Sequence, residues 1–278
     1  MVWLTWRQHR VQALVTAALL ALAAVLLLAD ALPTDVVKML PWAPVLIGLF
    51  WGVPLFTKEF ERGTYRVVWT QTVTRRRWML VKFGMLGTAV ALAGLAAGGV
   101  VTAFAADQPG PDGFSAFAGD LFGASGIAPV GWYLFLFALG ATAGAFLRRM
   151  LPAMAVTIAV FAALVFGAFL GRPYYAEPEL SVGSLESGNT DPVPPNALTV
   201  SHGWMNADGT MVDMNDTVVL CPGPEQMNCL ADKGYDRFYT YYHPESRYWR
   251  FQLTETALLV LGAVALASLT AYRTIRRA

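Results

Sequence analysis

Six apolar blocks, each roughly as long as a bilayer is thick, constrain this chain more than any other feature of its sequence. A helix needs about 20 mostly apolar residues to cross roughly 30 Å of hydrocarbon, and these segments meet or approach that length. Polar loops separate them, and a composition of 56% hydrophobic and 14% charged residues is typical of a polytopic membrane protein. We therefore predict an all-α membrane protein with six transmembrane helices at Val11–Leu28, Leu40–Phe56, Leu80–Ala106, Ile127–Phe146, Leu151–Leu170 and Phe251–Tyr272.

Two of the six segments depart from a simple span. Pro41, Pro44 and Pro54 interrupt the second, which offers only about 17 residues, and Pro44 is expected to distort the helix. The third is about 27 residues long, so we expect it to tilt or to project beyond the bilayer.

The placement of Lys and Arg predicts which side of the membrane each loop faces. With the N-terminus inside, most of the 20 basic residues are cytosolic, whereas Glu59 and Glu61 are the only acids on that side. Both termini are then cytosolic. Arg7 and Arg10 before the first span also fit a cleaved signal peptide, but the apolar run is long for one, and the Trp-rich segment VWLTWRQHR favours an interfacial amphipathic helix.

The stretch Glu61–Lys82, ERGTYRVVWTQTVTRRRWMLVK, lies between the second and third spans. Each of the arginines at positions 75–77 would cost about 2.5 to 3.5 kcal/mol at the centre of a spanning helix, so these charges must lie outside the hydrocarbon. We expect a short helix capped by Thr64 and running through Trp69, followed by a basic run, up to Lys82, with its charges at headgroup level. An ordinary solvated basic loop is the alternative.

Residues 171–250 form a polar, proline-punctuated insertion, which we predict to be a small loop-rich external domain. The membrane part then comprises residues 1–170 and 251–278. Cys221 and Cys229, the only two cysteines, both lie in the insertion, and an oxidising exterior favours a disulfide between them. A metal site that adds His202 and His243 is the alternative, although the spacing is not that of a zinc site.

The sequence has no nucleotide-binding motif of its own. No stretch fits Gly, four residues, Gly-Lys-Ser/Thr, and the cytosolic loops are too short for a nucleotide-binding domain, so any ATP must be used by another chain. No acid or base lies deep in the predicted spans, which disfavours a proton relay. The nearest exception is Glu255, about one turn into the last span, which we interpret as an interfacial residue hydrogen-bonded to a neighbour or as an element of a gate.

Small and aromatic residues in the spans support two further interpretations. Glycines four residues apart permit close helix contact, within the chain or between two copies, and the pairs are Gly94 with Gly98, Gly140 with Gly144, and Gly167 with Gly171. Aromatic residues of the second and fifth spans line an apolar substrate path unless they face lipid or the core, and these are Phe50, Trp51, Phe56, Phe161, Phe166 and Phe169.

The motif Glu61-x-Gly63-Thr64, followed by the basic cluster and by Lys82, resembles the cytosolic signature of the ATP-binding-cassette type-2 permeases. The segments WRQHR near the start and YYHPESRYWRFQLTE before the last span resemble permease subunits that are common in actinobacteria. Together with the six-span order, the resemblance touches most of the chain apart from the middle of the external insertion.

The resemblance implies a permease of the bacterial cell membrane, embedded in lipid, whose loop between the second and third spans is a coupling helix seated in a separate cytosolic ATPase. Two copies of that ATPase would bind ATP and Mg, a second permease subunit, identical or similar, would complete the assembly, and this chain would hold no cofactor. The coupling residues that it implies are Glu59, Glu61, Arg62, Gly63, Thr64, Arg66, Trp69, Arg75, Arg76, Arg77 and Lys82.

The resemblance implies an exporter. We expect its substrate to be amphipathic or apolar, such as a drug, natural product, peptide or lipid, because the spans offer aromatic surface and no fixed charge. No nucleic-acid partner is expected. The size of the insertion motivates a second hypothesis, a sensor or mechanical transmitter in which ATP-driven helix movement reshapes the external domain. A membrane-embedded enzyme using His202, His243 and nearby acids is the third, and no recognisable catalytic spacing supports it.

Overall fold

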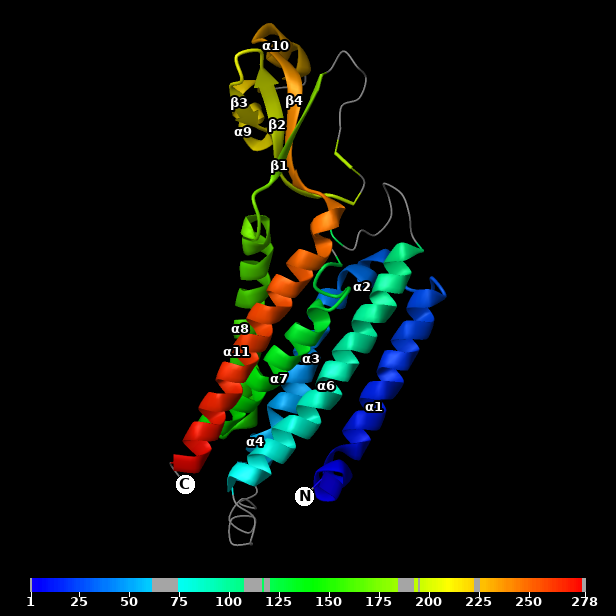
Figure 1. Cartoon of the computed structure of the whole chain (residues 1–278), viewed down its shortest axis with the longest axis vertical. Coiled ribbons are helices and arrows are strands. Elements are labelled where there is room, and N and C mark those ends of the chain that lie inside the picture. Colours follow the sequence, from blue (N-terminus) through cyan, green and yellow to red (C-terminus); the bar gives the residue numbers. More distant parts are fainter. Residues whose placement is uncertain are drawn as a thin grey trace. The chain divides into compact units, whose positions relative to one another are not determined.

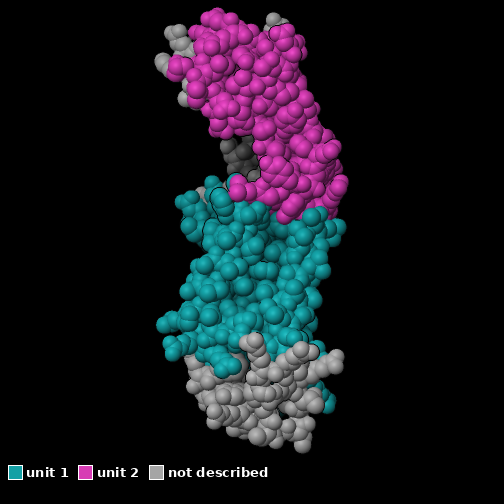
Figure 2. All heavy atoms as spheres, turned by 90° about the vertical axis from the view of Figure 1, so that its left-hand side faces the viewer, with its two compact units in different colours: residues 1–116, 120–169, 252–278 teal, residues 117–119, 170–251 magenta. Residues whose placement is uncertain are grey.

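The computed structural model describes residues 2–61, 75–107, 117, 121–184, 193–194, 196–222 and 226–276. The chain divides into two compact units, which Figure 2 colours separately. Unit 1 contains residues 1–116, 120–169 and 252–278, and unit 2 contains residues 117–119 and 170–251.

Unit 1 is a bundle of long helices that lie side by side (Figure 1). Among the described residues, five helices are long and apolar enough to cross a membrane, and a bent pair of shorter helices adds a sixth if it is one span. Helix α7 is central, since 72% of its most apolar stretch is buried, against 6% for α1. The five helices are α1 (Val2–Leu28), α6 (Arg75–Ala106), α7 (Ala128–Leu147), α8 (Met150–Gly171) and α11 (Tyr248–Arg276).

Helix α1 runs without a break through the N-terminal segment that the sequence predicted to be a separate interfacial helix. Neither Gly nor Pro occurs between Val2 and Leu28, so nothing in the local sequence ends one helix and starts another. Trp3 and Trp6 are exposed, and the guanidinium carbon of Arg7 lies 5.3 Å from the centroid of the Trp3 ring. The expectation of a separate helix is therefore corrected: the Trp-rich segment is the first part of α1.

The second predicted span is broken. Its two parts, Asp35–Trp42 and Pro44–Lys58, meet at an angle of 43° at the proline predicted to distort it. Pro54 has no N–H to donate to the Phe50 carbonyl four residues earlier, and the Gln12 side chain of α1 donates to that oxygen instead, at 3.0 Å. The elements of this region are α2 (Thr34–Lys38), the 3₁₀ turn η1 (Leu40–Trp42), α3 (Pro44–Ile47), the π-helix η2 (Gly48–Gly52) and α4 (Pro54–Glu61).

Two of the three glycine pairs bring helices together within this chain. A Cβ atom on Gly144 would lie 2.7 Å from the Val53 carbonyl oxygen, so α7 packs against the second-span region backbone to backbone. A Cβ atom on Gly94 would lie 2.8 Å from the Pro129 carbonyl oxygen, and α6 meets α7 there. Nothing described lies within 4 Å of the corresponding positions on Gly167 and Gly171.

The sequence predicted a loop-rich external domain, but the described residues of unit 2 contain a four-stranded antiparallel sheet in the order β1–β4–β2–β3, which corrects that expectation. Strand β4, YDRFYTYYH, is dense in aromatic and β-branched residues, a composition that favours strands and outweighs the proline signals around it. The elements are η3 (Arg172–Tyr174), β1 (Glu179–Ser184), β2 (Leu198–Asn206), β3 (Met211–Asp213), α9 (Met214–Leu220), α10 (Gln226–Asp232), β4 (Tyr235–His243) and η5 (Glu245–Arg247).

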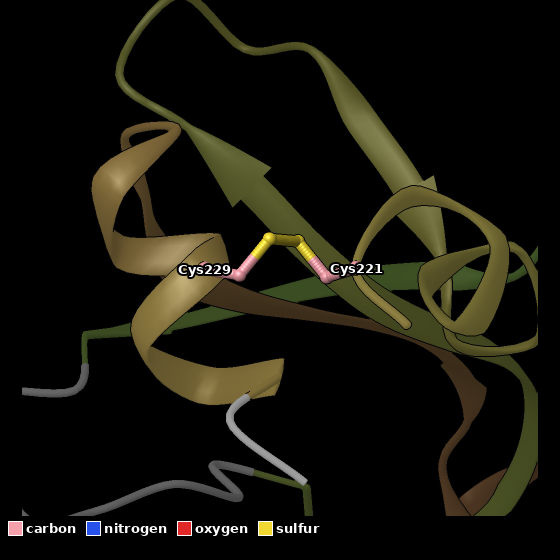
Figure 3. Close-up of a disulfide and its surroundings, with 2 residues drawn as sticks. All are labelled: Cys221 and Cys229. Atoms are coloured by element: carbon pink, nitrogen blue, oxygen red, sulfur yellow. A yellow bond between two sulfur atoms is a disulfide. The ribbon is translucent and has the colours of Figure 1, made fainter. Parts of the chain in front are cut away.

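The predicted disulfide is confirmed. Cys221, directly after α9, is joined to Cys229 of α10, with Cα atoms 5.9 Å apart (Figure 3). The bond forms part of a small buried cluster with Trp204 and Leu230, so it ties both short helices to the sheet. Groups of three or more His, Cys, Asp or Glu side chains able to hold a metal ion are not found among the described residues.

Candidate functional site

The segment predicted to couple to an ATPase begins and ends on helices of unit 1. Helix α4 ends at Glu61 and contains Glu59, and α6 opens with the arginines at positions 75–77, of which Arg77 is exposed. The remaining predicted residues of the coupling segment lie outside the described residues, and these are Arg62, Gly63, Thr64, Arg66 and Trp69.

Lys82, predicted to end the basic run of the coupling segment, is buried between helices of the bundle. It is 3% exposed, and its Nζ atom lies 4.4 Å from the centroid of the Trp78 ring. Trp78 packs edge-on against Phe56 of α4, with ring centroids 5.9 Å apart. A cation over an aromatic face is stabilised by roughly 0.5 to 2 kcal/mol, which helps to hold a lysine between α4 and α6.

The same end of the bundle also carries Arg148 and Arg273. Helix α7 ends at Leu147, Arg148 adopts a left-handed conformation with φ of 57°, and α8 starts at Met150, so a tight turn joins the two helices. Near the end of α11, the guanidinium carbon of Arg273 lies 3.8 Å from the centroid of the Phe146 ring. The ends of α4, α7 and α11 and the start of α6 therefore meet on one side of the bundle, which is the side predicted to be cytosolic (Figure 1).

At the opposite end, Gln252 of α11 caps α7 from another part of the chain. Its Oε1 atom accepts hydrogen bonds from the backbone N–H groups of Ile127, at 3.0 Å, and Ala128, at 2.7 Å. Its Nε2 atom donates to the Phe122 carbonyl oxygen at 3.0 Å. Ile127 itself provides no side-chain cap, so a residue 125 positions away satisfies N–H groups at the start of the helix.

One turn further along α11, Glu255 accepts a hydrogen bond from Trp132 Nε1 at 2.8 Å. The side chain of Glu255 is only 2% exposed, so it lies between helices, and the predicted hydrogen bond to a neighbour is confirmed. Deeper in the bundle, the Thr142 and Thr270 hydroxyl oxygens lie 2.9 Å apart and join α7 to α11 again. Sequence reasoning singled out Glu255 but missed its partner, because Trp132 is 123 residues away.

The six aromatic residues proposed for a substrate path occupy different surroundings. Trp51 is buried, and its Nε1 atom donates to Thr16 Oγ1 of α1 at 3.0 Å. Phe161 is buried between Trp42 and Trp132, with ring centroids 5.6 and 5.9 Å away. Phe56 is buried beside Trp78, as described above. The exposed members of the set are Phe50, Phe166 and Phe169.

A cavity of about 540 Å³ opens among α1, the second-span region, α6 and α7. Small apolar residues of α1 and α6 line two of its sides, and Trp51 is the largest aromatic side chain in its lining. Tyr133 of α7 also lines it while remaining only 6% exposed. Of the six aromatic residues above, Trp51 alone lines this cavity.

In unit 2, a polar cluster joins the residues that follow α8 to those that precede α11. His243 Nε2 lies 3.0 Å from the Pro173 carbonyl oxygen and donates to it, so His243 Nδ1 accepts from Arg247 Nη1 at 3.1 Å. Arg247 also pairs with Glu179, with Nη2 and Oε1 2.7 Å apart. Burial lowers the pKa of His243 below its usual value, and the adjacent Arg247 charge lowers it further, against the opposing effects of the Pro173 carbonyl and Glu179.

Comparison with known proteins places the membrane part of the chain in a family. A search of the curated proteins returns no match. The sequence model of the family described as "ABC-2 membrane transporter related" matches residues 29–172, which is just over half of the chain. The match runs from the end of α1 through α8 and includes the segment between α4 and α6. This chain therefore belongs to the ABC-2 membrane transporter related family and is a multi-pass membrane subunit of an ABC transporter.

Proposed function

We propose that this chain is the permease subunit of an exporter that moves an amphipathic or apolar substrate with energy from a separate cytosolic ATPase. The family match over residues 29–172 carries this proposal. Two ATPase copies would bind ATP and Mg, and a second permease, identical or similar, would complete the complex. Residues 59–82 would form the contact through which the ATPase moves the helices.

The packing of unit 1 supports a route for that movement. The segment follows α4 and precedes α6 in the chain, and the contacts of Phe56 of α4 with Trp78 and Phe83 of α6 hold these two helices together. Helix α7 packs on the second-span region without intervening side chains at Gly144. A push at the α4–α6 connection would therefore displace packed elements as a group, because close-packed helices transmit strain.

The test is a coupling assay in proteoliposomes that contain the full chain and its cognate ATPase. Glu61→Ala and a Gly63→Ala/Thr64→Ala double variant should lower permease-stimulated ATP hydrolysis and transport about ten-fold, a loss within the range of typical coupling free energies. Arg148→Ala, in the other turn at the same end of the bundle, is the matched control and should retain activity. Normal ATPase association and transport in the Glu61 and Gly63/Thr64 variants would refute the coupling role.

A transmitter that works on unit 2 without moving a substrate is the second candidate. The structure of unit 2 favours this transmitter function, because a four-stranded sheet with its own disulfide is larger and more ordered than a loop that only connects two spans needs to be. Substrate-stimulated ATP hydrolysis together with uptake into sealed vesicles would exclude this function as the main one.

A further inference from the structure

The polar cluster of unit 2 joins two segments that lie next to spanning helices in the chain. Helix α8 ends at Gly171, two residues before Pro173, and α11 begins at Tyr248, directly after Arg247. His243, the last residue of β4, contacts both Pro173 and Arg247. A change in the state of this one ring therefore alters the connection between the end of α8 and the start of α11 within unit 2.

The two hydrogen bonds of the His243 ring require one form of the imidazole. The Pro173 carbonyl oxygen can only accept, so Nε2, 3.0 Å away, must carry a hydrogen. The Arg247 guanidinium can only donate, so Nδ1, 3.1 Å from Nη1, must present its lone pair. Both contacts form together only in the neutral ring that carries its hydrogen on Nε2.

The surroundings of the ring leave no substitute for either partner. His243 is fully buried, so water does not reach it to replace a lost hydrogen bond. Its ring lies 4.9 Å from the ring of Phe251, and β2 pairs with it through the apolar Leu198. Among the described residues, the charged groups that act on the imidazole are Arg247 and Glu179, which pair with each other at 2.7 Å. The pairing with Arg247 reduces the attraction that Glu179 offers to a charged ring.

Protonation of His243 disrupts the cluster at one defined contact. The second hydrogen binds Nδ1, which then points a donor at Nη1 of Arg247 and places a positive ring beside a positive guanidinium. Arg247 keeps its hydrogen bonds to the Glu177 carbonyl oxygen and to Glu179, because neither involves the imidazole. The ring keeps its donor to Pro173. The hydrogen bond between the end of β4 and η5 is the one that is lost.

We propose that the hydrogen bond between His243 and Arg247 is an acid-sensitive latch, which ties η3 to η5 through the neutral ring and opens when the ring is protonated. Burial and the Arg247 charge both lower the pKa of His243, so opening is expected below pH 6.5. The latch would make the segments after α8 and before α11 respond to the pH of the compartment that unit 2 faces. It goes beyond the proposed function, because it requires neither an ATPase nor a substrate.

The experiment measures backbone hydrogen exchange of the full chain in nanodiscs by mass spectrometry at pH 7.5 and 5.5. Rates are corrected for the intrinsic effect of pH on exchange. Protection in peptides that cover residues 172–179 and 243–251 should fall about five-fold at the lower pH, as expected for the loss of one hydrogen bond. Residues 211–232, which contain the disulfide, should keep their protection, because the latch does not contact them.

Two variants test whether His243 is the group that titrates. Glutamine presents a donor and an acceptor at once but does not titrate, so His243→Gln should keep both segments protected at pH 5.5. His202→Gln, at an exposed histidine of β2, is the matched control and should lose protection as the wild type does. Should His243→Gln fail to fold, exchange of the imidazole C2 hydrogen in the wild type measures the protonation midpoint of each histidine separately.

A His243 midpoint below about 6.5 that coincides with the loss of protection in the two segments supports the latch. Three results would overturn it: protection that does not change with pH, protection that falls equally in His243→Gln, or a His243 midpoint away from the transition of the segments. Loss of protection over all of unit 2 at once would also overturn it, because that result indicates global unfolding. The measurements involve neither ATP hydrolysis nor transport, so their failure leaves the proposed function to its own test.

Discussion

Replacement of Gln252 by Ala should destabilise unit 1 more than the loss of any single exposed polar contact. The side chain is fully buried and bonds two N–H groups of α7 and the carbonyl of Phe122. Hydrogen bonds between membrane helices contribute about 0.6 kcal/mol on average and up to about 1.7, whereas unpaired buried groups cost about 1 to 3 kcal/mol each. At the value for hydrogen bonds between membrane helices, the three hydrogen bonds of Gln252 give an expected loss of about 2 to 5 kcal/mol.

Two further variants separate the hydrogen bonds of Gln252 from its volume. Gln252→Glu keeps the oxygen that faces the α7 N-terminus, where a negative charge is favourable, but replaces the Nε2 donor with an acceptor oxygen that faces the Phe122 carbonyl oxygen, so it should cost about 1 to 3 kcal/mol. Gln12→Ala is the matched control on α1, because that glutamine donates one hydrogen bond to a backbone carbonyl, that of Phe50. Equilibrium unfolding in mixed micelles, followed by tryptophan fluorescence, measures each free energy. A loss for Gln252→Ala no larger than that for Gln12→Ala would refute the reasoning.

Two more predictions concern unit 2. The pKa of His243 is lower in the folded chain than its ordinary value of 6.5, so unfolding takes up protons, and stability should fall as the pH drops below about 6.5. Near-ultraviolet circular dichroism of the melting transition from pH 8 to 5 should show this loss of stability. The variant His243→Gln should lose this pH dependence. A Cys221→Ser/Cys229→Ser variant should lose about 2.5 kcal/mol, the loop-closure value for a separation of 8 residues, and become more sensitive to protease. Unchanged protease resistance in that variant would argue against a stabilising role for the bond.

Where the sequence predicted structure well, the controlling physics was local or was imposed by the bilayer. The length of an apolar run is enough to locate α1, α7, α8 and α11, because hydrocarbon thickness sets the length of a span. The missing N–H of proline explains the break at Pro44. Cys221 and Cys229 had no other cysteine to pair with, so their bond followed from composition and compartment.

The sequence interpretation failed where a short-range signal competed with another. Prolines and polar residues in the insertion indicated loops, but the β-branched and aromatic content of β4 prevailed once β1 and β2 could pair with it on either side. The sequence placed Lys82 at the end of a basic run but did not predict its contact with Trp78, which depends on the packing of the bundle.

The amino-acid sequence by itself determined the membrane character, the approximate spans, the basic end of the bundle and the family motif between α4 and α6. Only the tertiary structure decided that Gln252 caps α7, that Glu255 accepts a hydrogen bond from Trp132, and that small residues of α1 and α6 line a cavity together with Tyr133. The reason is physical: apolar length and charge act on each segment separately, whereas caps, buried pairs and cavities depend on which side chains the fold brings together across more than 100 residues.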